Sequence, residues 1–331
     1  MAAYTTIDNP ELYFQCKIWS GNATDDTAIT LDGDKNMQPD LIWTKRRNAS
    51  TNHDVWDAVR GALKQIAPNN GEAEASISSS VKSFDTDGFT VGTNTNLNAS
   101  GGTYVAWCWK ERADAGFDIV SYTGNGSART ISHSLSAKPH FIVVKNRSDA
   151  DNYWQVQHRS LGATKNLLLN DTNAVATVST FWNDSEPTTS VFSVGTHDDT
   201  NENTDSLIAY LWSEKQGFSK VGSYIANGNA NGVYVHLGFR PAYLLIKNKT
   251  SSSTNWHIYD NKRLGYNIDN DMQRANIQNA DATDDDLDML SNGFKLRRVT
   301  TALNTDGDTY VYMAFAEQPF VNSKGVPCNA R

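Results

Sequence analysis

The sequence predicts an all-β fold, organised as three tandem β-sandwich repeats of about 100 residues each. Short runs rich in β-branched and aromatic residues alternate with turn-forming pairs such as Asp87-Gly88 and Asn292-Gly293. Such pairs supply the positive φ angles that tight turns need. Aromatic residues make up 10% of the chain, which gives many short strands enough apolar surface for sandwich cores. One pattern of these features also occurs three times along the chain.

The recurring pattern is clearest where a proline precedes an apolar run that ends in a basic residue. The run occupies residues 39–46, 139–147 and 241–248, so its copies lie about a hundred residues apart. Each copy is typical of a buried strand with a defined start and a solvated end. In each repeat, a strand that begins at an aromatic residue comes before the proline-preceded run, at 14–19, 117–122 and 218–224. Each repeat ends with a strand rich in aromatic residues, at 104–109, 207–212 and 310–315.

These boundaries divide the chain into five parts. They are an N-terminal leader (1–13), three repeats (14–116, 117–217 and 218–317) and a C-terminal tail (318–331). The linkers between repeats are very short, which predicts semi-rigid stacking of neighbouring repeats. We expect each isolated repeat to fold, and the leader to attach the protein to a partner. Near-helical apolar spacing at 54–66, before Pro68, is compatible with a short helix or a turn, and 281–290 is a second candidate.

Composition and charge exclude several classes of protein. The 331 residues carry a net charge of −8, whereas nucleic-acid-binding proteins present a basic face. The three cysteines are scattered and form no CxxC pair, so neither a disulfide scaffold nor a zinc site is expected. No apolar run is long enough to span a bilayer, and the N-terminus lacks the features of a secretory signal.

The sequence also lacks the familiar motifs of metal and cofactor sites. The histidines show no HExxH or HxH spacing, and neither a GxSxG nucleophile motif nor a GxGxxG phosphate-binding loop occurs. We therefore expect no cofactor and no metal centre.

Six strings of the sequence are distinctive: FDIVSYTGNGSARTISHSLSAKPHFIVVKNRS, GFSKVGSYIANGN, LGFRPAYLLIKNK, WHIYDNKRLGYN, LSNGFKLR and YVYMAFAEQPF. These strings, and the leader MAAYTTIDNPELYFQ, resemble a repeat family found in structural proteins of tailed bacteriophages, many of them from aquatic hosts. The resemblance covers most of the chain and is weakest at 62–80 and 270–288. It implies a virion component built of lectin-like β-sandwich repeats, on a tail or a capsid surface. Because phage fibres are commonly trimeric, it also implies a homotrimer.

Acidic residues are the first candidates for chemistry. Asp57 and Asp260 occupy matching positions in the first and third repeats, where the second repeat has His158. Glycoside hydrolysis needs two carboxylates about 5–10 Å apart in a cleft. A repeated position beside an aromatic strand is, however, typical of a structural turn or cap. The densest acidic run, 281–288, could supply oxygen ligands to Ca²⁺, although a solvated acidic loop is the simpler interpretation.

Aromatic residues are the second group of candidates. Most tryptophans fall on the repeated strands and are expected to fill cores. Trp182 is the exception, because residues 180–184 (TFWND) have the composition of a polar loop. Aromatic rings stack on sugar rings, and the neighbouring Asn183 and Asp184 can bond to sugar hydroxyl groups. We therefore expect a glycan-contact loop formed by Trp182, Asn183 and Asp184.

Together these features predict a non-enzymatic bacteriophage virion structural protein that adheres to host surface glycan. It would be exposed on the particle, as a tail fibre, a spike or a capsid-surface appendage. It would be assembled in the host cytoplasm, bind other virion proteins through the leader, and form a homo-oligomer without nucleic acid or membrane insertion. Weak contacts would be multiplied by the copies within and between chains. Two alternatives stay open: a polysaccharide depolymerase, and a passive architectural or decoration protein without a host ligand.

Overall fold

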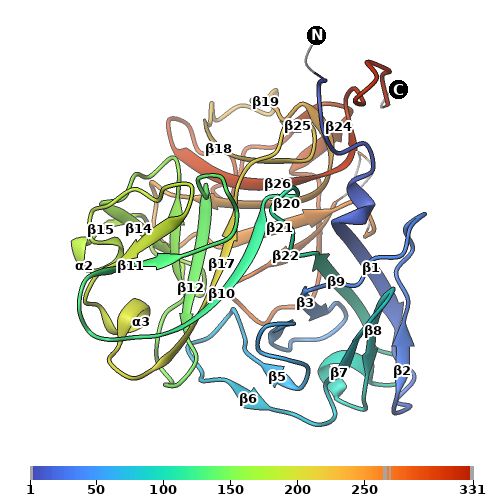
Figure 1. The fold of residues 1–331 in the computed structure, drawn as a ribbon. Helices are drawn as coiled ribbons and strands as arrows, with labels where there is room; N and C mark the ends of the chain where they lie inside the picture. The colour runs from blue at the N-terminus through green and yellow to red at the C-terminus, as the bar shows by residue number, and fades with distance from the viewer. Residues whose placement is uncertain (1–2, 264–266, 268–269, 329–331) are drawn as a thin grey trace.

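The computed structural model describes residues 3–263, 267 and 270–328, and these residues form an almost purely β protein (Figure 1). The predicted all-β class is therefore confirmed. Helical structure in the described part consists of single turns: η1 (Pro10–Leu12), α1 (Thr95–Asn98), α2 (Ser179–Trp182) and α3 (Asp198–Asn201). Within the same residues, no helix combines the length and the apolar character that a membrane crossing requires.

The first segment (14–116) forms an antiparallel main sheet, a smaller sheet and a two-stranded ribbon. The main sheet has the order β1 (Phe14–Ser20), β9 (Thr103–Trp109), β3 (Leu41–Arg46) and β4 (His53–Asp57). The smaller sheet has the order β2 (Thr27–Ile29), β8 (Gly88–Val91) and β7 (Val81–Asp85). The ribbon pairs β5 (Lys64–Gln65) with β6 (Ala75–Ser76).

The second segment (117–217) has a longer main sheet and a two-stranded smaller sheet. The main sheet has the order β10 (Phe117–Thr123), β17 (Ser206–Trp212), β12 (Phe141–Asn146), β13 (Gln155–His158), β14 (Lys165–Leu168) and β15 (Ala176–Thr177). The smaller sheet pairs β11 (Arg129–Ser132) with β16 (Val191–Val194).

The third segment (218–317) follows the same plan, and its closing strand continues a little further. Its main sheet has the order β18 (Ser219–Ile225), β26 (Thr309–Pro319), β20 (Phe239–Asn248), β21 (Trp256–Asp260), β22 (Asn270–Arg274) and β23 (Ala282–Asp284). Its smaller sheet has the order β19 (Tyr234–His236), β25 (Gly293–Leu296) and β24 (Leu287–Leu290).

The order of strands recurs in the three main sheets. In each, the first long strand of the segment pairs with the closing aromatic strand, which pairs in turn with the strand at the repeated proline. This pairing brings the two ends of each segment together, because the first and closing strands are antiparallel neighbours. A repeated unit would produce this recurrence, and the division into three repeats stays a prediction.

Each main sheet is buried on both faces. One face packs against the smaller sheet of its own segment, as Ile42 does with Phe89 in the first segment and Ile142 with Phe192 in the second. The opposite faces of the three main sheets share a single hydrophobic cluster. At its centre the ring of Trp109 lies 6.1 Å from that of Trp212 and 5.7 Å from that of Phe315, measured between centroids. The three segments therefore surround a common core.

Hydrogen bonds join the segments into a closed ring. The side chain at one equivalent position of each segment bonds through a ring nitrogen to a backbone carbonyl of the preceding segment. In the first segment, this bond goes to the third segment. The contacts are Trp154 Nε1 to Ala67 O (3.1 Å), Trp256 Nε1 to Leu168 O (2.7 Å) and His53 Nε2 to Arg274 O (3.1 Å). Because the last contact closes the ring, each segment touches both of the others.

The lysines that end the three proline-preceded strands are buried, contrary to the predicted solvated end, and two of them strengthen this ring. Lys45, Lys145 and Lys247 are fully buried, and burial lowers the pKa of each amine to about 8. Lys145 Nζ donates to Gly71 O of the first segment at 3.0 Å, and Lys247 Nζ donates to Thr172 O of the second at 3.0 Å. Lys145 and Lys247 thus tie a main sheet to a loop of the neighbouring segment, whereas Lys45 Nζ donates to Arg46 O and Ala49 O of its own segment.

Of the two possibilities at 54–66 the turn is present, at 58–60, and the helix is not; the helix considered at 281–290 is wrong. Residues 54–66 complete β4 and then turn into β5, and residues 281–290 contain β23 and β24. The helix-like spacing has another cause, since Val55 and Ile66 form an antiparallel bridge and both enter the common core. Asp57 caps the intervening turn by accepting a hydrogen bond from the backbone N–H of Arg60 at 2.8 Å.

The predicted leader packs against the third segment and the tail. Tyr4 Oη donates to Gly238 O at 2.7 Å, Ile7 is buried in the common core, and Asp8 accepts a bond from Ser323 N at 2.6 Å. The first and last described parts of the chain therefore lie on one side of the molecule (Figure 1). Residues 1–2 of the leader and 329–331 of the tail lie outside the described residues, and the attachment role of the leader stays a prediction.

Candidate ligand-binding groove

The structure separates the three residues of the predicted glycan-contact loop. Trp182 is fully buried in the core between the two sheets of the second segment, beside Phe192 and Leu207. Its ring presents no face to solvent, which contradicts its interpretation as an exposed loop residue. Asn183 and Asp184 are exposed and have positive φ angles of 52° and 48°, as expected of residues that end a helical turn. Sugar stacking on Trp182 is therefore excluded in this conformation.

The repeated acidic position has a structural role. Asp57 and Asp260 are buried, and each binds the arginine three residues later and an aromatic donor of another segment. The contacts are Arg60 Nε (2.5 Å) and Tyr210 Oη (2.7 Å) at Asp57, and Arg263 Nε (2.7 Å) and Trp107 Nε1 (2.9 Å) at Asp260. His158, at the matching position, places Nε2 3.2 Å from Tyr312 O of the third segment. These positions connect segments, in agreement with a structural turn.

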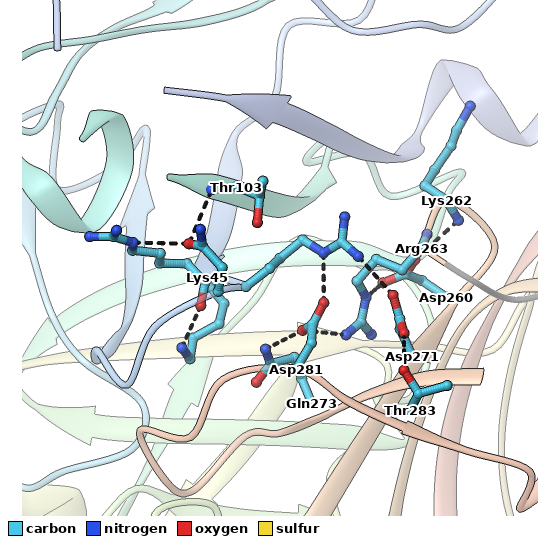
Figure 2. A network of polar contacts seen from close by, with 12 residues as sticks. Lys45, Thr103, Asp260, Lys262, Arg263, Asp271, Gln273, Asp281 and Thr283 are labelled. Carbon is cyan, nitrogen blue, oxygen red and sulfur yellow. Dashed lines mark hydrogen bonds and ion pairs between the residues drawn. The ribbon is translucent and has the colours of Figure 1, made fainter. Parts of the chain in front are cut away.

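Ion pairs also account for most of the acidic run at 281–288. Figure 2 shows Asp281 and Asp271 converging with Arg263 where the first and third segments meet. Arg47 of the first segment reaches Asp271 at 2.7 Å and Asp281 at 2.6 Å, and Arg263 reaches Asp281 at 3.1 Å. Asp284 and Asp285 pair with Arg298, and Asp288 pairs with Arg297. In the described part of the chain, no group of three or more His, Cys, Asp and Glu residues is arranged to hold a metal.

A groove opens in the third segment, between the edges of its two sheets. One wall is β18, the edge strand of the main sheet, and the other is β19, the edge strand of the smaller sheet. Arg159, Ser160 and Glu214 of the second segment border one end. We call this space, which holds about 500 Å³, the third-segment groove. Both strands lie in the upper part of Figure 1.

An exchange of side-chain size between two paired strands shapes this groove. On β18, Gly222 pairs with Tyr312 of β26. The same register position holds Lys17 with Ala106 in the first segment, and Val120 with Ala209 in the second. The large side chain thus stands on the inner strand in the third segment and on the edge strand in the others. A Cβ atom at position 222 would lie 2.6 Å from the Tyr312 hydroxyl oxygen, so only glycine leaves room for this ring.

The second wall carries aromatic and polar side chains of β19. Tyr234 is 41% exposed, and its hydroxyl donates to Asn292 Oδ1 at 2.6 Å, which holds the ring at the rim. His236, also exposed, stands two residues further along the strand. The position of Tyr234 is occupied by Ala28 on β2 and by Thr130 on β11, so this aromatic wall belongs to the third segment.

Charged groups complete the lining. Arg159 and Glu214 form an ion pair of 2.6 Å, and Lys220 Nζ donates to His236 O at 2.8 Å. The groove therefore combines aromatic faces with several hydrogen-bond donors and one carboxylate. Such a lining suits a polyhydroxylated ligand, which stacks its apolar face on a ring and exchanges hydrogen bonds around its edge. Among the described residues that line the groove, Glu214 is the one acidic residue and is already paired, so the second carboxylate of a hydrolytic pair is not seen there.

None of these groove residues was a candidate from the sequence. A signal was present, since β18 carries a glycine where the corresponding strands carry a lysine and a valine. Its meaning depends on knowing that position 222 pairs with Tyr312, which requires the strand register. Arg159 and Glu214 gave no signal at all, because they reach the groove only through contacts between segments.

A comparison with protein families places the whole ring in one family. The model described as "Domain of unknown function (DUF7483)" matches residues 9–319, so the chain belongs to this family. No curated protein matches the chain.

Proposed function

We propose that this member of the DUF7483 family is a structural protein of a tailed bacteriophage, exposed on the virion, that adheres to host surface glycan. The observation that supports binding is the third-segment groove, which is lined by the exposed Tyr234 and by several hydrogen-bond donors. The virion assignment rests on the resemblance of the repeated strings to structural proteins of tailed phages. Assembly in the host cytoplasm and exposure on the particle follow from that assignment.

In this proposal the groove binds a saccharide through Tyr234, Tyr312 and its basic rim. A sugar ring stacks on Tyr234, and Tyr312 forms the floor above Gly222. Arg159, Lys220 and the imidazole of His236 supply donors to hydroxyl or carboxylate groups of the glycan. One such site binds weakly. A homo-oligomer, for which we propose a trimer, presents several sites at once and raises the avidity.

The leader and the tail supply the proposed connection to the particle. Residues 4–8 are held against Gly238 and Ser323, so the first and last described parts of the chain form one continuous surface. We propose that other virion proteins contact this surface. The protein would then act without nucleic acid and without entering a membrane.

Binding of the fluorescently labelled full chain to an array of bacterial capsular polysaccharides and lipopolysaccharides tests the proposal. The informative variant is Gly222→Val/Tyr312→Ala, which rebuilds the Val120–Ala209 pair of the second segment inside the third. We expect the wild-type chain to bind a subset of glycans and this variant to lose at least about tenfold in apparent affinity. Tyr234→Thr, which copies Thr130, should have a similar effect, whereas Thr130→Ala should have none.

Two results would contradict the proposal. Unchanged glycan binding by a folded Gly222→Val/Tyr312→Ala chain would show that the groove is not the binding site. No binding to any glycan by the wild-type chain would instead favour the passive architectural alternative. Release of reducing ends from a bound polysaccharide would favour the depolymerase alternative.

A further inference from the structure

A second groove lies on the second segment and shares no lining residue with the third-segment groove. It lies beside β13, β14 and β15, and the short helices α2 and α3 form its other wall. Phe181 and His197 come from this helical wall, and Tyr153 precedes β13 at the opposite rim. We call this space, which holds about 420 Å³, the second-segment groove. It lies next to the buried Trp182, whose neighbour Phe181 lines it.

The floor of this groove is a chain of hydrogen bonds that ends in an unused acceptor. Gln155 Nε2 donates to Asp199 Oδ2 at 2.6 Å, and Asn166 Nδ2 donates to Gln155 Oε1 at 2.9 Å. All three side chains are buried, with Asn166 3% exposed. Asn166 Oδ1 has no hydrogen-bond partner among the residues that the structure describes. A buried acceptor without a donor costs about 1–3 kcal/mol, so the floor is suited to a ligand that brings a donor.

The charge of the lining points to a cation. Asp151, Asp198 and Asp199 line the groove, and no lysine or arginine does so among the described residues. The nearby Lys145 ammonium is directed at the carbonyl groups of Gly71 and Asn152. Burial raises the pKa of Asp199, and the hydrogen bond from Gln155 and the charge of His197 oppose this shift. Both carboxylate oxygens of Asp199 already accept a hydrogen bond, Oδ1 from Tyr153 N at 3.1 Å and Oδ2 from Gln155 Nε2. A positively charged donor would therefore balance the buried charge of Asp199 and supply the unused Asn166 Oδ1 with a partner.

The rim adds an aromatic surface beside these acceptors. Tyr153 is 43% exposed, and Phe181 packs against the ring of His197 with centroids 4.2 Å apart. A cation held near an aromatic face gains attraction from the ring, and the apolar face of a sugar gains contact area. The groove thus combines a stacking surface, hydrogen-bond acceptors and negative charge.

The first segment contains a similar network of buried hydrogen bonds, but it lacks the exposed aromatic ring beside it. There Asp54 accepts bonds from Gln65 and Asn96, and Gln65 Oε1 has no partner in the described structure. The strand registers place these three residues at the positions of Gln155, Asn166 and Asp199. The positions of Tyr153 and Asp198 hold Asn52 and Thr95 there, so the aromatic ring and the additional charge are features of the second segment.

We propose that the second-segment groove binds a protonated amino sugar. The ammonium group lies between Asn166 Oδ1 and the carboxylate of Asp199, and the sugar ring stacks on Tyr153. This site uses neither Tyr234 nor Gly222, so it does not rest on the function proposed for the third-segment groove.

Isothermal titration of the full chain at about pH 7 with glucosamine, glucose and N-acetylglucosamine tests this site. The three sugars share one ring and differ in whether they carry an ammonium group. We expect glucosamine to bind at least about tenfold more tightly than the other two, in line with a charged hydrogen bond. Equal binding of the three sugars, or no detectable binding of glucosamine, would overturn the proposal.

Two variants locate the site. Asp199→Asn keeps an oxygen for Gln155 Nε2 but removes the charge, and we expect it to abolish the preference for glucosamine over glucose. Tyr153→Ala changes an exposed ring and should weaken glucosamine binding by about fivefold or more without loss of folding. Gly222→Val/Tyr312→Ala is the matched control and should leave glucosamine binding unchanged. Loss of binding in this control, with binding intact in Tyr153→Ala, would assign the amino sugar to the third-segment groove and overturn the proposal.

Discussion

Trp182 illustrates how burial decides the role of a single residue. Its polar sequence neighbours favour an exposed loop, yet the turn of α2 directs the indole into the core of the second segment. Asn183 and Asp184 remain exposed because they end this turn with left-handed backbone conformations. The polar residues around Trp182 therefore mark the end of a helical turn. The local composition does not determine whether the indole ring points into the core or into solvent.

Replacement of Trp182 by alanine should lower stability substantially. The side chain is fully buried, and truncating a buried aromatic residue to alanine costs about 3–5 kcal/mol. Urea denaturation followed by tryptophan fluorescence measures the change, with Thr180→Ala on the exposed side of the same turn as the control. A loss below about 1 kcal/mol for Trp182→Ala would show that the residue is not part of a packed core.

Asp54 should make stability depend on pH. Burial raises the pKa of its carboxyl from 3.8 to about 7, although hydrogen bonds from Asn96 and Gln65 oppose the shift. Between about pH 4 and pH 7 the unfolded chain releases this proton while the folded chain retains it. The contribution of Asp54 to stability is therefore complete below pH 4 and is lost as the pH rises through 7.

The variant Asp54→Asn should remove this dependence. The difference in unfolding free energy between the variant and the wild type should shift in favour of the variant by up to about 4 kcal/mol between pH 4 and pH 8. Urea titrations of both chains at several pH values measure this difference, which cancels the contributions of other groups. A difference that stays constant across the range would contradict a raised pKa for Asp54.

At the level of elements, the sequence predicted strands well and their partners poorly. The proline-preceded runs became β3, β12 and β20, because apolar, β-branched runs favour extended chain wherever both faces are buried. The choice between helix and turn at 54–66 stayed open, because a local apolar period cannot distinguish one helix from two short strands joined by a turn. The pairing of Gly222 with Tyr312 could not be predicted either, since each is unremarkable without its partner.

The large and small side chains at the paired positions of β18 and β26 can be exchanged together with little loss of stability, whereas changing Gly222 alone should be destabilising. Gly222→Val alone would force the Tyr312 ring to move, because the added Cβ lies 2.6 Å from its hydroxyl oxygen. We expect this overpacking to cost about 1–3 kcal/mol. Gly222→Val/Tyr312→Ala restores a pair that the second segment already accommodates, so it should recover most of that loss. Thermal unfolding of the three chains measures the effect, and a double variant less stable than the single one would contradict this account of the groove.

At the scale of the whole molecule, the three segments depend on one another. Trp109, Trp212 and Phe315 come from different segments and meet in one cluster, and hydrogen bonds close the ring between the third and first segments. The sequence could not show this, since tandem copies joined by short linkers are equally compatible with a row of separate domains. Only the contacts between faces distinguish a ring from a row.

The isolated second segment should therefore fail to fold as a stable monomer, contrary to the expectation for independent repeats. Separated from its neighbours, a chain of residues 117–217 would expose Phe141, Trp154 and Trp212, which lie in the common core. We expect weak near-ultraviolet circular dichroism and aggregation for this fragment, and one cooperative transition in calorimetry for the full chain. A soluble fragment with its own sharp unfolding transition would contradict the ring of dependent segments.

The most direct test of the proposed adhesion is a competition experiment with intact phage. Host cells of a phage that carries this protein are incubated with excess purified chain, phage is added, and unadsorbed particles are counted. We expect dose-dependent blocking by the wild-type chain and about tenfold weaker blocking by Gly222→Val/Tyr312→Ala at equal concentration. No blocking by a correctly folded wild-type chain, or equal blocking by both chains, would contradict adhesion through the third-segment groove.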